Sequence, residues 1–246
     1  MAKKRLDILL VEKGLADNRS RAQSLIMTGN VSTGGRKLEK AGENFDEDIE
    51  ISVKQPDHPY VSRGGTKLAH AIKHFSIEVE GKKCIDVGSS TGGFTDCLLQ
   101  LGAESVTALD VGKGQLDWKL RNDSRVISKE EFNAREMSPE NAGGLFEIAV
   151  IDVSFISLEL ILNPVKGVMQ PGGEILALVK PQFEVGKVEA SKGRGIIRDP
   201  KSHISVIEKI ASFGESIGLA SKGFTESPIT GAKGNKEFFI HFKAPE

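Results

Sequence analysis

The sequence predicts an α/β protein, a doubly wound domain of parallel strands that follows a small N-terminal α+β module. From residue 83 onward, short apolar runs alternate with helical patterns, as expected for buried parallel strands joined by helices. A glycine-rich turn, GSSTGG, follows the first of these runs. Before them, the segment QPDHP (55–59) combines two prolines with polar residues, which is typical of a linker.

The first part of the chain reads as a compact module of two helices and short strands. Residues 5–14 and 18–29 carry apolar residues at helical spacing, and each stretch ends at a glycine. Strand-like pieces follow around Val31 and at 49–53. We therefore expect residues 1–59 to form a small domain with its linker, and residues 60–246 to form the second domain.

The second domain is expected to alternate strands with helices. The predicted strands are KCIDVGS (83–89), SVTALDV (105–111), FEIAVIDVSF (146–155) and GGEILALVKP (172–181). The predicted helices are 92–102, 157–169 and 200–218. The last apolar run, KEFFIHFKA (236–244), is expected to be an edge strand. Strands that alternate with helices in this way indicate a doubly wound sheet.

Composition and charge exclude several classes of protein. The net charge is only −1 over 246 residues, so no global field marks a nucleic-acid binder. Residues 1–40 nevertheless carry nine Lys/Arg and four Asp/Glu, which is a local basic excess of five. The two cysteines lack the spacing of metal ligands, so no metal is expected and both should be buried free thiols. We find no signal peptide or membrane-spanning run and expect a cytoplasmic protein.

The glycine-rich turn favours a cofactor without phosphates. A dinucleotide fingerprint needs glycine at the position of Ser90, so a dinucleotide-dependent oxidoreductase is disfavoured. Asp86 precedes the turn and can meet the charged methionine end of S-adenosylmethionine. Asp110 ends the next strand, where an acid binds ribose hydroxyls in related folds. The alternative is that these are ordinary turn glycines and capping aspartates.

Charged residues also stand at the ends of further strands. Asp152 and Lys180 each close an apolar run, and Glu237 opens the last one. A lysine at the end of a buried strand is costly unless it is paired or used. Lys67 follows the turn SRGG in the first turn of a helical pattern, where the helix dipole disfavours a cation. The simpler alternatives are an ion pair that serves stability alone and a solvated surface lysine.

Several long motifs resemble those of the TlyA family. They are SRGGTKL, DVGSSTGGFTDCLLQ, DVGKGQLDWKLRND, VIDVSFISL, VKPQFEVGK, IIRDP, SPITG and GNKEF, and they span nearly the whole chain. Members of this family are ribosomal RNA 2′-O-methyltransferases, many of which carry the name hemolysin. The resemblance implies an FtsJ-like, Rossmann-like methyltransferase domain after a small RNA-binding module of the kind found in ribosomal proteins.

The resemblance also implies the site residues. A catalytic Lys-Asp-Lys-Glu tetrad falls on Lys67, Asp152, Lys180 and Glu237. Lys180 would be the base, Lys67 would supply positive charge, and the two acids would orient the lysines. The residues expected to bind S-adenosylmethionine are Asp86, Gly88, Ser90, Gly92, Gly93, Phe94, Asp110, Val111 and Asn133. Near Asn133, Glu131 and Phe132 depart from the Arg-Thr pair that is common in the family.

The expected partner is ribosomal RNA or a ribosomal subunit, with no membrane partner. The candidate RNA-binding residues are Arg5, Arg19, Arg21, Arg36, Lys37, Arg63, Lys187, Lys192 and Arg194, which would contact phosphates. The predicted function is 2′-O-methylation of a ribose, with cytidine as the expected nucleotide. The alternative functions are a membrane-active hemolysin and a binding protein without catalysis. Tyr60, Phe155 and Phe183 lie near the site motifs, and we expect Phe155 to be buried core.

Overall fold

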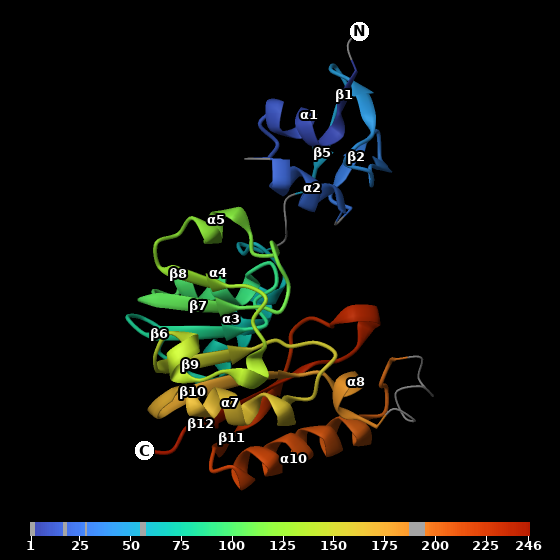
Figure 1. Cartoon of the computed structure of the whole chain (residues 1–246). Coiled ribbons are helices and arrows are strands. Elements are labelled where there is room, and N and C mark those ends of the chain that lie inside the picture. Colours follow the sequence, from blue (N-terminus) through green and yellow to red (C-terminus); the bar gives the residue numbers. More distant parts are fainter. Residues whose placement is uncertain (1–2, 17–18, 28, 55–57, 187–194) are drawn as a thin grey trace. The chain divides into compact units, whose positions relative to one another are not determined.

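The computed structural model describes residues 1–246 except residues 1–2, 17–18, 28, 55–57 and 187–194. It divides the chain into two compact units, residues 1–59 and 60–246 (Figure 1).

The N-terminal unit packs two short helices against two small antiparallel sheets. The helices are α1 (Leu6–Glu12) and α2 (Arg19–Met27). Strand β1 (Lys3–Arg5) pairs with β4 (Asn44–Asp46), and β2 (Val31–Thr33) lies between β3 (Arg36–Lys37) and β5 (Ser52–Val53). The apolar residues at helical spacing converge in one core of Leu6, Leu10, Ala16, Ala22, Leu25, Ile26, Val31 and Leu38.

The C-terminal unit is built on a seven-stranded sheet. Its strands are β6 (Lys83–Val87), β7 (Ser105–Leu109), β8 (Val126–Lys129), β9 (Phe146–Ile151), β10 (Met169–Val179), β11 (Ala220–Glu226) and β12 (Phe238–Lys243). The order is β11-β12-β10-β9-β6-β7-β8. The five strands from β10 to β8 run parallel, and β12 is antiparallel to both of its neighbours. The fold class predicted from the sequence is confirmed.

Helices cover both faces of this sheet (Figure 1). One face packs against α3 (Gly64–Phe75), α4 (Gly93–Gln100) and α5 (Trp118–Arg121). The other packs against α6 (Pro139–Ala142), α7 (Leu162–Gly167) and α10 (Pro200–Ser216). The remaining short helical turns are η1 (Ala134–Glu136), η2 (Leu158–Leu160), α8 (Pro181–Glu184) and η3 (Ala232–Gly234).

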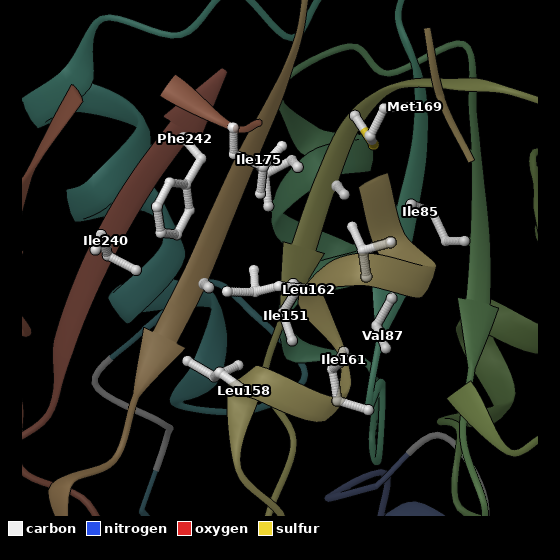
Figure 2. Close-up of a cluster of buried hydrophobic side chains, with 14 of the residues drawn as sticks. Ile85, Val87, Ile151, Leu158, Ile161, Leu162, Met169, Ile175, Ile240 and Phe242 are labelled. Atoms are coloured by element: carbon white, nitrogen blue, oxygen red, sulfur yellow. The ribbon is translucent and has the colours of Figure 1, made fainter. Parts of the chain in front are cut away.

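Strand β9 shows why the inner strands are apolar throughout. Ile148 and Val150 belong to the core under α3 and α4, whereas Ala149 and Ile151 belong to the core under α7 and α10. Because successive side chains point to opposite faces, a strand covered on both faces needs apolar residues at every position. Figure 2 shows the second of these cores, to which β6, β9, β10 and β12 all contribute side chains.

The two cysteines lie in the core on the α3 and α4 side of the sheet. Cys84 and Cys97 are both free and buried, as expected from the sequence. Burial raises the pKa of each thiol to about 12, because the thiolate would lose its hydration.

Two expectations about elements were wrong. The last strand, β12, is not an edge strand, because it lies between β10 and β11. The single helix expected at 157–169 is two short pieces, η2 and α7, and Pro164 lies in the first turn of α7, where its missing N–H costs no intrahelical bond. The two true edge strands, β8 and β11, were not foreseen.

The buried leucine of α4 provides a test of this core. Leu98 is fully buried, whereas Leu101, at the end of the same helix, is 40% exposed. We expect Leu98→Ala to lower the free energy of unfolding by about 2–5 kcal/mol, because it removes buried methyl groups and leaves a cavity. We expect the matched change Leu101→Ala to cost only about 0.5 kcal/mol. Denaturant unfolding of both variants, followed by fluorescence of Trp118, measures the difference; equal losses would contradict the packing.

Candidate active site

Five adjacent strands bring their functional residues to one edge of the sheet. Asp152 follows β9 and Lys180 follows β10 at the carboxyl ends of these parallel strands. Strand β12 runs the other way, and its first residue, Phe238, pairs with the last residue of β10, Val179. Glu237 therefore lies at the same edge. The glycine-rich turn after β6, which we expect to bind the cofactor, and Asp110 after β7 complete the row.

A cavity of about 550 Å³ opens at this edge. Its walls include the four residues of the predicted tetrad: Lys67, Asp152, Lys180 and Glu237. The structure therefore brings together residues that are up to 170 positions apart in the chain. Ligands of open α/β sheets bind in the crevice outside the carboxyl ends of the strands, and this cavity occupies that position.

The tetrad forms two ion pairs with little exposure to solvent. The Nζ of Lys67 lies 2.6 Å from an Oε of Glu237, and their side chains are 13% and 3% exposed. The Nζ of Lys180 lies 2.5 Å from an Oδ of Asp152, with side-chain exposures of 10% and 24%. Lys67 extends from the first turn of α3, so Glu237 offsets the charge that the helix dipole disfavours there.

Lys180 has further acceptors around its ammonium group. It donates hydrogen bonds to the backbone oxygen of Val153, at 3.0 Å, and to the hydroxyl of Ser154, at 2.9 Å. Pro181 follows it and begins the short helix α8, which ends the strand at this point. The position of Lys180 is therefore fixed by the turn that carries Asp152.

Asp86 is the buried acid of the site. Its side chain is wholly buried, and one oxygen accepts hydrogen bonds from the backbone N–H and the hydroxyl of Thr95, at 3.0 and 2.7 Å. The other oxygen has no hydrogen-bond partner among the described residues. Burial raises the pKa of Asp86 to about 7; the bonds from Thr95 oppose this rise, and the charge of Asp152 adds to it.

The unpaired oxygen of Asp86 provides a test of cofactor fit. Asp86 lines the cavity, so a cationic ligand group there would find an acceptor that the protein leaves unpaired. The turn that follows is shaped for close approach. Gly88 has φ +90°, and a Cβ at this position would lie 2.6 Å from the backbone oxygen of Asp152. The ammonium and sulfonium groups of S-adenosylmethionine fit these residues better than a pyrophosphate does.

Asp110 is held by the cofactor turn. Its carboxylate accepts bonds from the backbone N–H of Ser90, at 2.8 Å, and of Gly112, at 2.7 Å. Asp110, Val111 and Asn133 do not line the cavity itself. Val111 is 73% exposed, and Asn133 caps the turn η1 through the N–H of Arg135.

The remaining cofactor candidates lie in or beside the cavity wall. Gly88, Ser90, Gly93 and Phe94 line it, and Gly92 caps the start of α4. Phe94 is only 3% exposed and packs on Phe239, with ring centroids 5.8 Å apart.

Residues that the sequence did not single out complete the cavity. Ser154 and Gln182 line it, and each follows a proposed catalytic residue within two positions. Glu184 is buried and binds the loop after Asp152, because it accepts bonds from the Ser157 hydroxyl, at 2.6 Å, and the Leu158 N–H, at 2.8 Å. Burial raises the pKa of Glu184, and the bond from Ser157 opposes that rise. The signal in the sequence that could have found these residues is their position shortly after the predicted strand ends.

Phe155 corrects an expectation. It was expected to be buried, but it is 89% exposed and has φ +63°. Its ring lies 5.0 Å from that of Phe183, and both side chains line the cavity. A left-handed backbone conformation is unusual for a phenylalanine, and no sequence pattern around Phe155 predicts it.

The candidate RNA-binding residues divide into three groups. Arg5 and Arg19 both bond to the buried carboxylate of Asp7 in the N-terminal unit. Gln23, one helical turn after Arg19, also donates a hydrogen bond to Asp7. The exposed residues are Arg36 and Lys37 on β3 and Arg63 at the start of α3. The side chain of Arg21 and all of Lys187, Lys192 and Arg194 fall outside the described residues.

The described residues hold no group of three or more His, Cys, Asp or Glu arranged to bind a metal ion. Among the helices described, none is both long and apolar enough to span a membrane.

Comparisons with known proteins show the family to which the two units are similar. The model of the FtsJ-like methyltransferase family matches residues 60–244, and that of the S4 domain matches residues 4–50. YqxC of Bacillus subtilis, a candidate rRNA methyltransferase, is 50% identical over 99% of this chain and 86% of its own length. TlyA of Mycobacterium tuberculosis, a 16S/23S rRNA (cytidine-2′-O)-methyltransferase, is 41% identical over 96% of this chain and 88% of its own.

A solved structure covers the whole chain. It is the structure of a candidate hemolysin from Streptococcus thermophilus, whose sequence is 44% identical to this chain. The two structures align with a TM-score of 0.77 over 100% of this chain and 90% of the hemolysin chain.

The buried Asp86 predicts a pH dependence. In the unfolded chain its pKa is near 3.8, and in the folded chain it is about 7. Folding therefore takes up a proton between these values, so the contribution of Asp86 to stability falls as the pH rises through this window. We expect Asp86→Asn, which cannot ionise, to gain stability relative to the wild type between about pH 5 and pH 7. Denaturant midpoints of the cofactor-free proteins measure this; a constant difference would contradict the assignment.

Proposed function

The chain belongs to the TlyA family of FtsJ-like methyltransferases, and we propose that it methylates a ribose 2′-hydroxyl of ribosomal RNA, with S-adenosylmethionine as the methyl donor. The observation that carries the proposal is the convergence of Lys67, Asp152, Lys180 and Glu237 on one cavity, beside the unpaired oxygen of Asp86. Two lysines, two acids and the glycine-rich turn after β6 therefore line the same space.

The proposed cofactor site follows the edge of the sheet from β6 to β7. Asp86 would receive the ammonium group of the methionine part, and the turn from Gly88 to Gly93 would let the cofactor lie against the backbone. Asp110 would bind the ribose hydroxyls of the adenosine, with Val111 and Asn133 beside it. When bound, S-adenosylmethionine supplies a methyl group activated by its positively charged sulfur.

The tetrad is proposed to handle the proton of the target hydroxyl. A ribose 2′-hydroxyl is a poor nucleophile until its proton leaves, and Lys180 is the proposed acceptor. It would act as the neutral amine, after the ammonium group that pairs with Asp152 has released a proton to solvent. Asp152 and Ser154 hold the Lys180 amine in place. Lys67, fixed by Glu237, supplies positive charge beside the oxygen as negative charge develops on it. Alignment of the reacting groups supplies a large further part of the rate.

The RNA is proposed to reach the cavity as an extruded nucleotide. A target inside a helix must leave its stack to enter a pocket of this kind. The exposed Phe155 and its neighbour Phe183 stand at the cavity and offer flat faces to a base. The relative named a cytidine methyltransferase makes cytidine the proposed target. The N-terminal S4 unit would hold the surrounding RNA. A ribosomal substrate would require the protein to act in the cytoplasm.

The decisive experiment combines methyl transfer with a single substitution. We expect the wild type to transfer label from S-adenosylmethionine to one or more ribose positions of ribosomal subunits, which can be mapped as 2′-O-methylated nucleotides. We expect Lys180→Ala to lower this rate by at least about a hundred-fold, because it removes the proton acceptor. Binding of S-adenosylmethionine, measured by calorimetry, should stay nearly unchanged, since the proposal assigns Lys180 to the target hydroxyl and not to the cofactor.

Lys222→Ala is the matched control. Lys222 is an exposed lysine of β11 outside the cavity, and its loss should leave the rate at the wild-type level. Wild-type turnover in Lys180→Ala would refute the assignment of the base. Membrane lysis, the alternative named by the hemolysin relative, is tested by dye release from liposomes. Dye release together with an absence of methyl transfer would overturn the proposed function.

A further inference from the structure

We propose that Asp7 joins Arg5 and Arg19 into one binding site for a phosphate of the RNA backbone. This inference rests on the proposed function, because it describes how the N-terminal unit would hold the RNA. Asp7 is a positioning residue in this proposal: it does not touch the RNA, and it acts through the two arginines.

The geometry places both guanidinium groups on one carboxylate. Asp7 lies in the first turn of α1, and its side chain is 0% exposed. Arg5, from β1, donates from Nε to one oxygen of Asp7 at 3.0 Å and from Nη2 to the other at 2.9 Å. Arg19, from α2, donates from Nε to that second oxygen at 2.9 Å, and Gln23 donates to it at 2.8 Å. One buried oxygen atom therefore orients two arginines from different elements.

The charges leave a place for one anion. Hydrogen bonds from Arg5, in the first place, hold the pKa of Asp7 well below its usual range, so the carboxylate stays ionised at neutral pH. Among the described residues of this cluster, one negative charge then stands against two positive charges that cannot be neutralised by loss of a proton. The arginine side chains are 43% and 55% exposed, so this excess faces water. A phosphodiester carries a single negative charge and matches what remains.

The donors left on the arginines suit a phosphate. A guanidinium has five N–H groups in a rigid fork. Arg5 uses two of these on Asp7, and Arg19 uses one, so N–H groups of both remain on the exposed side. Their orientation is already fixed, so a phosphate that binds them avoids much of the entropy cost of ordering two long side chains.

Lys4, the neighbour of Arg5 on β1, shows the contrast. Its ammonium group lies 2.9 Å from Glu12 and 3.2 Å from Glu47, so two acids balance one cation. The surroundings of Lys4 are therefore negative, whereas those of Arg5 and Arg19 are positive. A buried ion pair is in itself weak evidence of a stabilising role, since apolar residues of similar size often serve stability as well. The exposed excess charge is what points to a ligand.

The test uses a substitution for which net charge and the proposed site predict opposite changes in RNA affinity. Asp7→Asn removes a negative charge from a unit that binds a polyanion, so charge alone predicts tighter binding. We expect the full chain instead to bind a short double-stranded RNA hairpin about ten-fold more weakly, because the two guanidinium groups lose their shared anchor and repel each other. The exposed Asp48 gives the matched control: Asp48→Asn should bind as tightly as the wild type or slightly more tightly.

A double-mutant cycle assigns the effect to the arginines. Arg19→Gln should weaken binding, and the slope of log affinity against log salt should fall by about 0.9, as expected for the loss of one phosphate contact. In the Arg19→Gln background, Asp7→Asn should then weaken binding by a smaller factor than in the wild type, because only Arg5 is left for Asp7 to orient. In methyl transfer by the Asp7→Asn variant, the change should appear as a higher KM for RNA. Wild-type or tighter binding by a folded Asp7→Asn variant would overturn the proposal.

A second variant keeps the proposal testable if Asp7→Asn unfolds the N-terminal unit, which hydrogen exchange would show. Arg19→Lys keeps the positive charge and removes the planar fork. We expect several-fold weaker binding of the same hairpin, and unchanged binding would overturn the proposal. Failure of this proposal leaves methyl transfer by the wild type intact, whereas failure of the proposed function is the absence of that transfer.

Discussion

The antiparallel pairing of β12 with β10 is the constraint on which the candidate site depends. It sets Phe238 opposite Val179, so the residues just beyond this pair, Glu237 and Lys180, emerge at the same edge. The parallel strands β9 and β6 bring Asp152 and the cofactor turn to that edge as well. A shift of one residue in the β10–β12 register would turn every side chain of β12 to the opposite face and take Glu237 away from Lys67. The apolar side chains of β12 resist such a shift, because both of its faces are buried.

Burial of the charged side chains of the site lowers the free energy gained on folding. Two lysines and two acids lie at the sheet edge with little contact with water, and each cation is satisfied by a specific anion. Removal of one member of a buried pair typically costs about 3–5 kcal/mol, because the other member stays buried without a partner. Asp86 adds an acid whose ionised form is disfavoured by burial. The large apolar cores on both faces of the sheet offset this cost and hold the charged residues at the sheet edge.

The sequence was sufficient to predict the features that depend on local patterns of apolar and charged residues. The four buried parallel strands were predicted because strands covered on both faces are apolar throughout, and charged residues at their ends stood out against that background. Other features depend on tertiary partners. β8 and β11 carry polar residues because each has one free edge, so their patterns resemble loops. The position of β12 in the sheet was predicted wrongly, because an apolar pattern shows that a strand is buried but not which strands lie beside it. The exposure of Phe155 follows from a left-handed backbone, and the pairing of Asp7 with two arginines follows from the packing of β1, α1 and α2.

The contact between Gly88 and the turn that carries Asp152 has a thermodynamic consequence. The absence of a side chain at Gly88 lets the backbone of the proposed cofactor turn rest against the backbone of the proposed catalytic turn. Two backbones in such contact restrict each other's movement. If a ligand that orders the first turn also orders the second, linkage makes the effect mutual: bound cofactor would change the affinity for RNA by the same factor by which bound RNA would change the affinity for cofactor. The contact at Gly88 is the physical link through which such coupling would pass.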